Sequence, residues 1–320
     1  MEPRNPFSIL RNSKTNMTSR LVNHIKYWLN IFKHAGQIWL ESNAFANAGS
    51  LAFFTLFSIA PVMIVIVSVI GIFYGQEAAQ GQIAVQLQET IGAEAAETVQ
   101  QAVTSSSLKE GGLLATIGGV LAMLVGATTV FGQMQNSLNT IWTVAPKPSR
   151  NSIALFIRKR LTSLTIVLAV GFVMLVSLSL SVGLRVFLPS VQGWLPWYEA
   201  AFSMLDLIVS LLVASLLFGT IFKVLPDVRL SWRDVAVGSL LTAVLFTLGR
   251  SLIALYLSHT ATASTYGAAG SLVLLLLWVN YSSLILLYGA AFTKAHLLAR
   301  GQQVQPRSVA VRFRREIIED

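Results

Sequence analysis

The stretch Gly267–Ala291, GAAGSLVLLLLWVNYSSLILLYGAA, decides the fold because it runs for 25 residues without a charged side chain. As an α-helix, at about 1.5 Å per residue, it would be roughly 37 Å long and would cross a hydrocarbon core of about 30 Å with some tilt. A helix that is apolar on all sides needs lipid or other helices around it rather than water. The stretch therefore predicts a membrane span, and the rest of the chain is expected to supply its neighbours.

The composition of the whole chain supports a multi-span membrane protein. Of the 320 residues, 54% are hydrophobic and only 12% are charged, whereas a soluble domain has about 25% charged residues. The sequence contains no cysteine, which excludes disulfides, thiolate nucleophiles and cysteine metal sites. No signal peptide is expected, because no small-residue cleavage pattern follows the first long apolar run.

Hydropathy along the chain predicts an all-α, polytopic membrane domain at residues 43–293. A basic segment at 1–42 precedes this domain and a basic tail at 294–320 follows it. Apolar residues recur at every fourth position between the first two spans, which predicts a helical outer cap at 76–112. The six transmembrane helices are expected at about 46–75, 113–131, 161–182, 201–222, 235–257 and 267–291.

Two amphipathic helices are expected outside the spans. Apolar residues recur at helical spacing within 16–42, and basic residues occupy the other faces. This pattern fits either a helix lying on the membrane surface or a short helix packed against the bundle. Residues 132–144 continue the second span with one apolar face, and prolines at 146 and 148 end that helix.

Pro61 lies inside the first predicted span. A proline in a helix interior removes one backbone hydrogen bond and clashes with the preceding turn, so we expect a kink at this position. Ser58 is three residues earlier, and its hydroxyl is placed to satisfy part of the lost bonding.

The basic residues are distributed unevenly over the predicted loops. Of 23 lysines and arginines, the N-terminal segment holds 6, the loop after the second span 5, the loop after the fourth span 3 and the tail 6. By the positive-inside rule these four segments, and therefore both termini, are expected to be cytoplasmic. The net charge of +9 is then explained by topology and by contact with anionic membrane lipids, without a nucleic-acid partner.

Four stretches of the sequence carry a resemblance to a known family. They are SLAFFTLFSIAPVMIVIVSVIGIF, GATTVFGQMQNSLNTIWTV, KVLPDVRLSWRDVAVGSLLTAVLFTLGRSLIALYL and YGAAGSLVLLLLWVNYSSLILLYGAAFT. In order and spacing the chain resembles the YihY/virulence factor BrkB family over roughly residues 35–295; members of that family were formerly described as ribonuclease BN. The resemblance implies a bacterial inner-membrane protein with six helices. It implies no settled activity, although transport is often proposed for the family.

No catalytic, cofactor-binding or metal-binding cluster is expected. The four histidines, His24, His34, His259 and His296, have no ligand spacing to one another or to a carboxylate. The acidic residues gather in the predicted outer cap, on the wrong side of the membrane for RNA. The sequence contains no phosphate-binding loop, no GxGxxG after a strand and no GxSxG. The sequence therefore predicts no enzyme, and a ribonuclease least of all.

Three polar residues inside the predicted spans form the candidate site: Asp206, Arg250 and Asn280. An ionisable side chain at the bilayer centre costs about 2.5–3.5 kcal/mol on insertion scales, so such residues are functional candidates. Asp206 and Arg250 have similar expected depths, which predicts an ion pair or a shared wet cavity. The pair either fixes the helix register or belongs to a pathway for a headgroup or a proton. Asn280 either hydrogen-bonds between helices or contacts a substrate.

These features favour a transporter or handler of a lipid, an amphiphile or a small solute. Small-residue-rich helices, Pro61 and the acid–base pair support this interpretation, although no inverted repeat relates the first three spans to the last three. The alternative is a non-transporting membrane scaffold that binds partners through the outer cap or the cytoplasmic helices. An enzyme acting on a membrane lipid is the third hypothesis. A cavity lined by the three polar residues would favour the transporter, and a solid, dry bundle would favour the scaffold.

Overall fold

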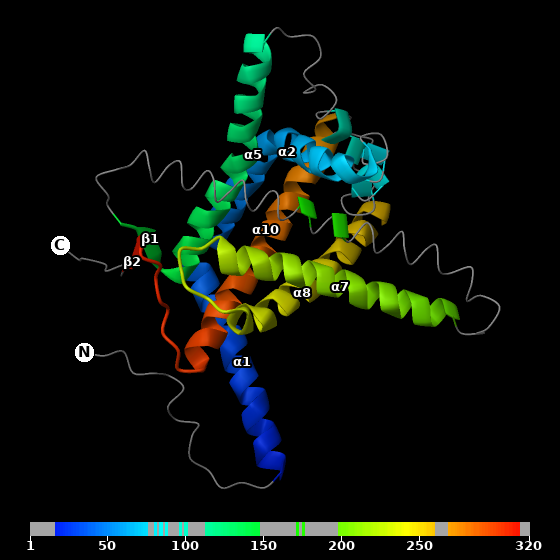
Figure 1. Cartoon of the computed structure of the whole chain (residues 1–320). Helices are drawn as coiled ribbons and strands as arrows, with labels where there is room; N and C mark the ends of the chain where they lie inside the picture. The colour runs from blue at the N-terminus through cyan, green and yellow to red at the C-terminus, as the bar shows by residue number, and fades with distance from the viewer. Residues whose placement is uncertain are drawn as a thin grey trace.

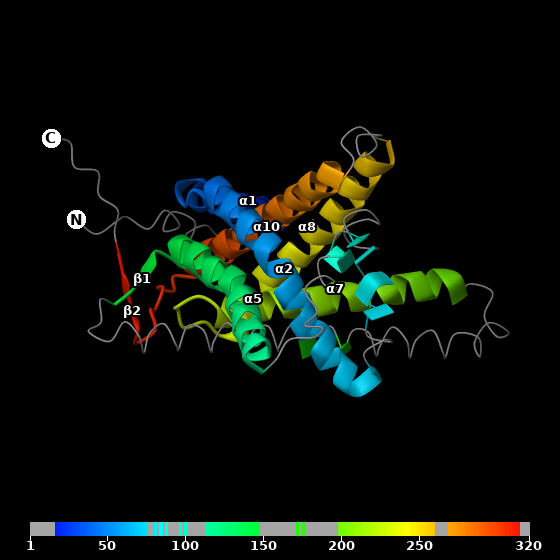
Figure 2. The same cartoon turned by 90° about the horizontal axis from the view of Figure 1, so that it is seen from above.

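The computed structural model describes residues 17–75, 80–81, 83–85, 87–88, 96–97, 99–101, 113–147, 171–172, 175–176, 198–259 and 268–313. Two short antiparallel strands, β1 (Val144–Pro146) and β2 (Ala310–Arg312), lie at one side of the bundle (Figures 1 and 2). Six long helices carry most of the described residues: α1 (Met17–Glu41), α2 (Ala44–Tyr74), α5 (Leu113–Trp142), α7 (Tyr198–Val224), α8 (Trp232–His259) and α10 (Ala268–Ala299).

Among the described residues, four helices contain a stretch long and apolar enough to cross a membrane: α2 at Ala44–Ile64, α7 at Leu207–Val224, α8 at Trp232–Leu252 and α10 at Leu272–Ala299. They correspond to the first, fourth, fifth and sixth predicted spans. The second predicted span forms the first part of α5, which continues without a break through the predicted amphipathic helix. The third span, at 161–182, and the cap, at 76–112, fall largely outside the described residues. The helical membrane fold is therefore confirmed, while six spans stay a prediction.

Most residues of the four apolar stretches are not buried by other parts of the chain. Only 22% to 39% of the residues in each stretch are buried. Exposed leucines run along the outer faces of two helices: Leu212 and Leu216 of α7, and Leu248 and Leu252 of α8. In water this surface would be unfavourable by about 25 cal/mol for each Å² of apolar area, whereas hydrocarbon accepts it without that cost.

α1 packs along α10 (Figure 1). Ile31 and Ala35 on its inner face have no exposed surface. Trp28 stacks on Phe292 of α10, with the ring centroids 6.3 Å apart and an interplanar angle of 6°. The outward face of α1 carries three exposed apolar side chains, Val22, Ile25 and Leu29, beside the exposed Lys26 and Lys33. The helix thus has one face for the bundle and a mixed apolar and basic face that remains available to a membrane surface or a partner.

α8 and α10 contact each other at two glycines, and we call these paired contacts the Gly–Thr contact. A Cβ added to Gly238 would lie 1.9 Å from Thr293 Oγ1, and one added to Gly289 would lie 1.8 Å from Thr242 Oγ1. Each threonine hydroxyl donates to the glycine carbonyl four residues earlier on its own helix, at 2.6 Å for Thr242 and 2.8 Å for Thr293. The two GxxxT segments therefore contact each other reciprocally, and only a residue without a Cβ fits at either glycine position.

The segment after α10 returns across the ends of the neighbouring helices. α10 itself continues to Ala299, beyond the predicted end of the sixth span. The backbone N–H of Arg229 then donates to Gln305 O at 2.8 Å, and β2 pairs with β1 so that Val311 lies opposite Ala145. The predicted basic tail is therefore held against the bundle as far as residue 313. The strand pair is an addition to the all-α prediction.

Candidate functional site

The three predicted intramembrane residues lie on three different helices: Asp206 on α7, Arg250 on α8 and Asn280 on α10. Asp206 and Arg250 each lie 18 positions from the turn-side end of their helix, Val224 and Trp232. The two helices cross in the view of Figure 1, and the ends that lie away from this turn are apart in both views (Figures 1 and 2). The side chain of Asp206 is outside the described side chains, so its ion pair with Arg250 stays a prediction.

Arg250 and Asn280 occur at the same level of the α8–α10 pair. Their chain neighbours touch, because a Cβ added to Gly249 would lie 2.4 Å from the ring of Tyr281. Both side chains are half-buried. Within the described part of the chain, no hydrogen bond or ion pair joins Arg250 to Asn280. The structure thus brings the helix positions to one level without bonding the two side chains.

Pro61 lies inside α2, as the sequence places it in the first span. α2 remains helical on both sides of the proline. The ring packs against α5 at Gly126, where an added Cβ would lie 2.8 Å from Pro61 Cγ. A glycine at this position lets α5 approach the proline ring closely. The kink at Pro61 stays a prediction.

A polar cleft of about 790 Å³ opens where α7 ends, α8 begins and the segment after α10 returns. Its volume is in the usual range of small-molecule sites, about 300–1,000 Å³. Two apolar residues, Leu230 and Leu297, contribute to its wall. Charged and amide side chains dominate the rest of the lining: Lys223, Arg229, Asp234, Gln302, Gln303, Gln305 and Arg307.

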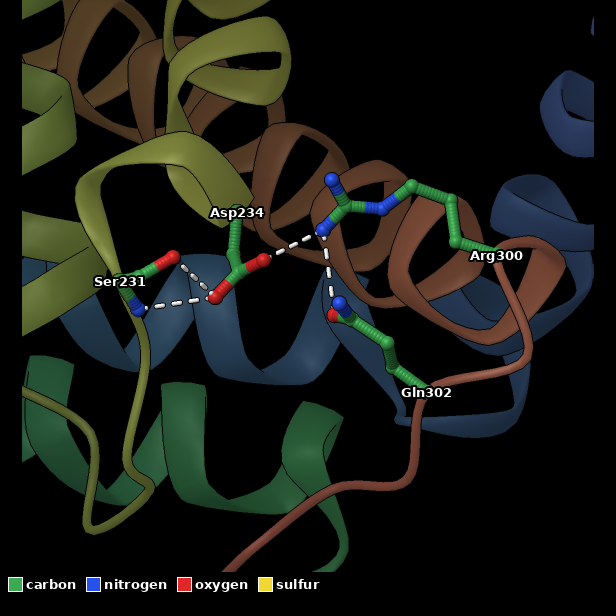
Figure 3. Close-up of polar contacts among 4 residues, drawn as sticks. All are labelled: Ser231, Asp234, Arg300 and Gln302. Carbon is green, nitrogen blue, oxygen red and sulfur yellow. Dashed lines mark hydrogen bonds and ion pairs between the residues drawn. The ribbon is translucent and has the colours of Figure 1, made fainter.

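Asp234 is the carboxylate of this lining, and its two oxygens are engaged (Figure 3). Oδ2 accepts hydrogen bonds from the Ser231 N–H at 2.8 Å and from the Ser231 hydroxyl at 2.6 Å, while Oδ1 accepts one from Arg300 Nη2. Arg300 also donates to Gln302 Oε1 at 3.1 Å. Ser231 and Asp234 cap the start of α8, where a carboxylate in the first turn is favoured by the helix dipole. The charge of Asp234 is therefore matched by Arg300 rather than by the cations of the cleft.

Two of the three cleft cations are held in position. Arg307 donates from Nη2 to Lys223 O at 3.0 Å, in the last turn of α7, and from Nε to Val228 O at 3.2 Å, in the turn that follows. The Lys223 ammonium lies 4.3 Å from the centre of the Trp232 ring, a cation–π contact between α7 and α8. Arg229, in contrast, is exposed, and its side chain has no partner among the described residues. The cleft thus combines two positioned charges with one free charge.

A buried carboxylate fastens the turn of the cleft to α5. Asp227 is 7% exposed and accepts hydrogen bonds from Asn139 Nδ2 at 2.8 Å and from Gln135 Nε2 at 3.4 Å. Its backbone N–H donates to Asn139 Oδ1 at 2.8 Å, and its carbonyl accepts from the Arg307 N–H at 2.9 Å. The turn between α7 and α8 is therefore fixed on one side by α5 and on the other by the returning segment.

The cleft lies where the apolar stretches end. Those of α7 and α10 end at Val224 and Ala299, and that of α8 begins at Trp232. The cleft residues flank these three positions. A tryptophan at such a boundary is typical of the membrane–water interface. The cleft is therefore at the expected depth of lipid headgroups.

Sequence reasoning missed this cleft. The basic residues at 223–233 and 294–307 contributed only to the count that predicts orientation. The signal that was present is a concentration of lysine, arginine and glutamine just beyond two apolar runs, in KVLPDVRLS at 223–231 and RGQQVQPR at 300–307. That these two segments form one wall depends on tertiary contacts that hydropathy does not contain.

Together these features define a polytopic helical membrane protein with a polar cleft at one end of its apolar helices. The sequence profile of the Virulence factor BrkB family matches residues 37–312, and the chain belongs to this family. The family resemblance found in the sequence is thereby confirmed.

The chain is also similar to bacterial proteins that are described as membrane proteins. A UPF0761 membrane protein of Psychromonas ingrahamii is 26% identical over 263 residues, which cover 80% of this chain and 85% of the relative. One of Mannheimia succiniciproducens is 25% identical over 77% of this chain and 82% of its own length. One of Stenotrophomonas maltophilia is 26% identical over 84% of this chain but 61% of its own length. No solved structure matches the chain significantly.

Proposed function

We propose that the protein transports or handles a lipid, an amphiphile or a small solute in the bacterial inner membrane. The observation that carries the proposal is the cleft of about 790 Å³ at the end of three apolar helices, with Lys223, Arg229 and Arg307 in its lining. Exposed apolar side chains, Leu216 of α7 and Leu240 of α8, lie on the helices that lead away from it. A ligand with a polar head and an apolar body could contact the cleft and the helix faces at the same time.

The proposal also assigns a role to the polar residues inside the predicted spans. Asp206 and Arg250 lie further along α7 and α8 than the cleft, and Asn280 lies on α10. In this proposal they give polar contacts to a headgroup or a proton within the apolar region, where an isolated charge is unfavourable. Both termini and the cleft are then cytoplasmic, as the basic residues predict.

A membrane scaffold is the second candidate, and the exposed side of α1 favours it. Val22, Ile25 and Leu29 lie on that side and are each about half exposed or more, at 47%, 56% and 61%. Exposed apolar side chains on one side of a helix are suited to a partner helix as well as to lipid. In this alternative the partner would be a protein, bound through the cytoplasmic helices or the outer cap, and no ligand would be moved.

Native mass spectrometry of the gently solubilised protein tests the proposal. Wild type is expected to retain a defined lipid or small molecule, and the double variant Lys223→Gln with Arg229→Ala is expected to lose it. Arg233→Ala is the matched control, because Arg233 is exposed at the start of α8 and lies outside the cleft lining. Asp206→Asn and Arg250→Ala test whether the intramembrane residues contribute to ligand retention. Folded wild type without any specific adduct would contradict the proposal and favour the scaffold.

A further inference from the structure

We infer that the cleft binds a phosphomonoester group, with Lys223 and Arg229 as the side chains that hold the anion. The inference rests on the proposed function and sharpens it by naming the chemical class of the ligand. Two sources present the same group: the headgroup of a phosphatidic-acid-like lipid, and a soluble phosphate ester. The charges, the free donors and the depth of the cleft carry the inference.

The charges of the lining favour a dianion. Lys223, Arg229 and Arg307 line the cleft, while the one carboxylate in the lining, Asp234, is paired with Arg300. The cleft therefore offers positive charge that no acidic group of its lining neutralises. A phosphomonoester carries a charge of about −1.5 to −2 at pH 7. A phosphodiester or a carboxylate carries about half of this charge, and it would leave the cleft cations incompletely matched.

The available donors assign the roles within the cleft. Arg307 uses Nε and Nη2 for backbone carbonyls, so it contributes mainly charge. The Lys223 ammonium lies over the Trp232 ring, and this contact leaves the N–H groups on the side away from the ring free for an anion. The exposed guanidinium of Arg229 is a planar fork that matches two phosphate oxygens. Lys223 therefore provides a positioned charge, and Arg229 closes on the ligand from solvent.

The depth of the cleft favours a phosphate. The apolar stretches of α7 and α8 end at Val224 and begin at Trp232, on either side of the cleft turn. Lipid phosphates lie at this boundary between hydrocarbon and water, and basic residues there attract anionic lipids. A lipid whose phosphate enters the cleft would keep its acyl chains beside the exposed apolar faces of α7 and α8.

Equilibrium titration in phosphatidylcholine nanodiscs at constant ionic strength tests the inference. Trp232 fluorescence reports binding because its ring contacts Lys223, and Trp232→Phe serves as the blank. The probes are phosphatidic acid and phosphatidylglycerol within the disc, and glycerol 3-phosphate in solution. At least one of the two phosphomonoesters is expected to bind saturably, with a Kd roughly tenfold below that of phosphatidylglycerol.

The variants separate a specific site from general surface charge. Lys223→Gln and Arg229→Gln are each expected to weaken phosphomonoester binding by roughly tenfold, because each removes a charged hydrogen-bond donor. Arg233→Gln removes the same charge nearby and is expected to leave the Kd unchanged. Arg229 is exposed, so its variant tests the site without depending on a folding change.

The outcomes are distinct. Saturation by phosphatidic acid alone assigns a membrane ligand, and saturation by glycerol 3-phosphate assigns a soluble one; both support the inference. Equal Kd values for phosphatidic acid and phosphatidylglycerol, or equal losses in Arg229→Gln and Arg233→Gln, overturn it. A co-purified ligand without phosphate also overturns it while the proposed function stands. A purified protein that retains no ligand and binds neither phosphomonoester contradicts both the inference and the proposed function.

Discussion

Asp227 keeps its carboxylate almost fully buried in the turn between α7 and α8, and Asn139 makes this burial tolerable. The Asn139 side chain donates to Asp227 Oδ2 and accepts from the Asp227 N–H, both at 2.8 Å. A buried carboxylate that loses a donor keeps its desolvation cost, which is several kcal/mol for an isolated ion. The position of the cleft turn therefore depends on one amide side chain of α5.

Asn139→Ala is expected to lower the free energy of unfolding by about 2–3 kcal/mol, because it removes both hydrogen bonds and leaves Asp227 short of donors. The shift in Tm of the detergent-solubilised protein measures the effect. Asn136→Ala is the control, since Asn136 lies one turn earlier on α5 with an exposed side chain. Equal shifts in Tm for the two variants would contradict the role assigned to Asn139.

The sequence can nominate individual residues as candidates only through their neighbours in the chain. Asp206, Arg250 and Asn280 were singled out because apolar neighbours surround them in the chain. Asp227 and Lys294 fall just beyond the predicted spans at 201–222 and 267–291, where charged side chains are expected to be exposed, and yet they are 7% and 8% exposed. Burial of such residues arises from distant partners: Lys294 Nζ donates at 2.7 Å to Ile141 O, 153 positions away. No local pattern contains that contact.

At the scale of elements, the Gly–Thr contact holds α8 against α10. Gly289→Ala is expected to destabilise the protein by about 1–3 kcal/mol, because the new methyl group would occupy the space of the Thr242 hydroxyl. Gly36→Ala in α1 is expected to act in the opposite direction, by about 0.5–1 kcal/mol, since nothing lies within 4 Å of its added Cβ. Tm values measure both. A second change, Thr242→Ala, should restore part of the loss in Gly289→Ala.

The strand pair is a second element that supports the cleft. Val311→Pro removes a backbone donor from β2 and is expected to free the returning segment, because proline does not fit inside a paired strand. Limited proteolysis between residues 301 and 313 is expected to be faster in the variant. Val311→Thr keeps the donor and the branched side chain and serves as the control. Unchanged cleavage in Val311→Pro would show that the strand pair does not hold this segment.

Helices and strands differed in how well the sequence revealed them. Long apolar runs predict helices because hydropathy is summed over about 20 residues, and α2, α7, α8 and α10 follow these runs. The segments GSLLT at 238–242 and GAAFT at 289–293 were visible in the sequence, but nothing in it paired them. β1 and β2 have three residues each, too few for a periodic signal. Their pairing joins segments that are more than 150 positions apart.

At the scale of the whole molecule, the orientation of the chain in the membrane stays a prediction. The chain has no cysteine, so each introduced cysteine is the only thiol in the protein. Ser308→Cys, in the returning segment, is expected to react with a membrane-impermeant maleimide only after spheroplasts are lysed. Lys109→Cys, in the predicted outer cap, is expected to react in intact spheroplasts. Labelling of Ser308→Cys in intact spheroplasts would contradict cytoplasmic termini.

The class of protein followed from composition and from the order of apolar and basic segments. Composition and segment order are properties of the sequence itself, so they can be determined without a tertiary structure. The cleft needs the third dimension, because its wall combines residues 223–234 with residues 297–307. Between these two segments lie most of α8 and most of α10. Their meeting depends on the close approach of those two helices, which the Gly–Thr contact permits.

The returning segment also sets an order of events during biosynthesis. Residues 302–307 leave the ribosome after every apolar stretch of the described chain, and yet they complete the wall of the cleft. A nascent chain folds from its N-terminus as it is made. A partly synthesised protein with its helices already inserted therefore has no finished cleft. The cleft is completed only in the last stage of translation, so an arrested or prematurely terminated chain lies in the membrane without the site that the proposed function assigns to the ligand.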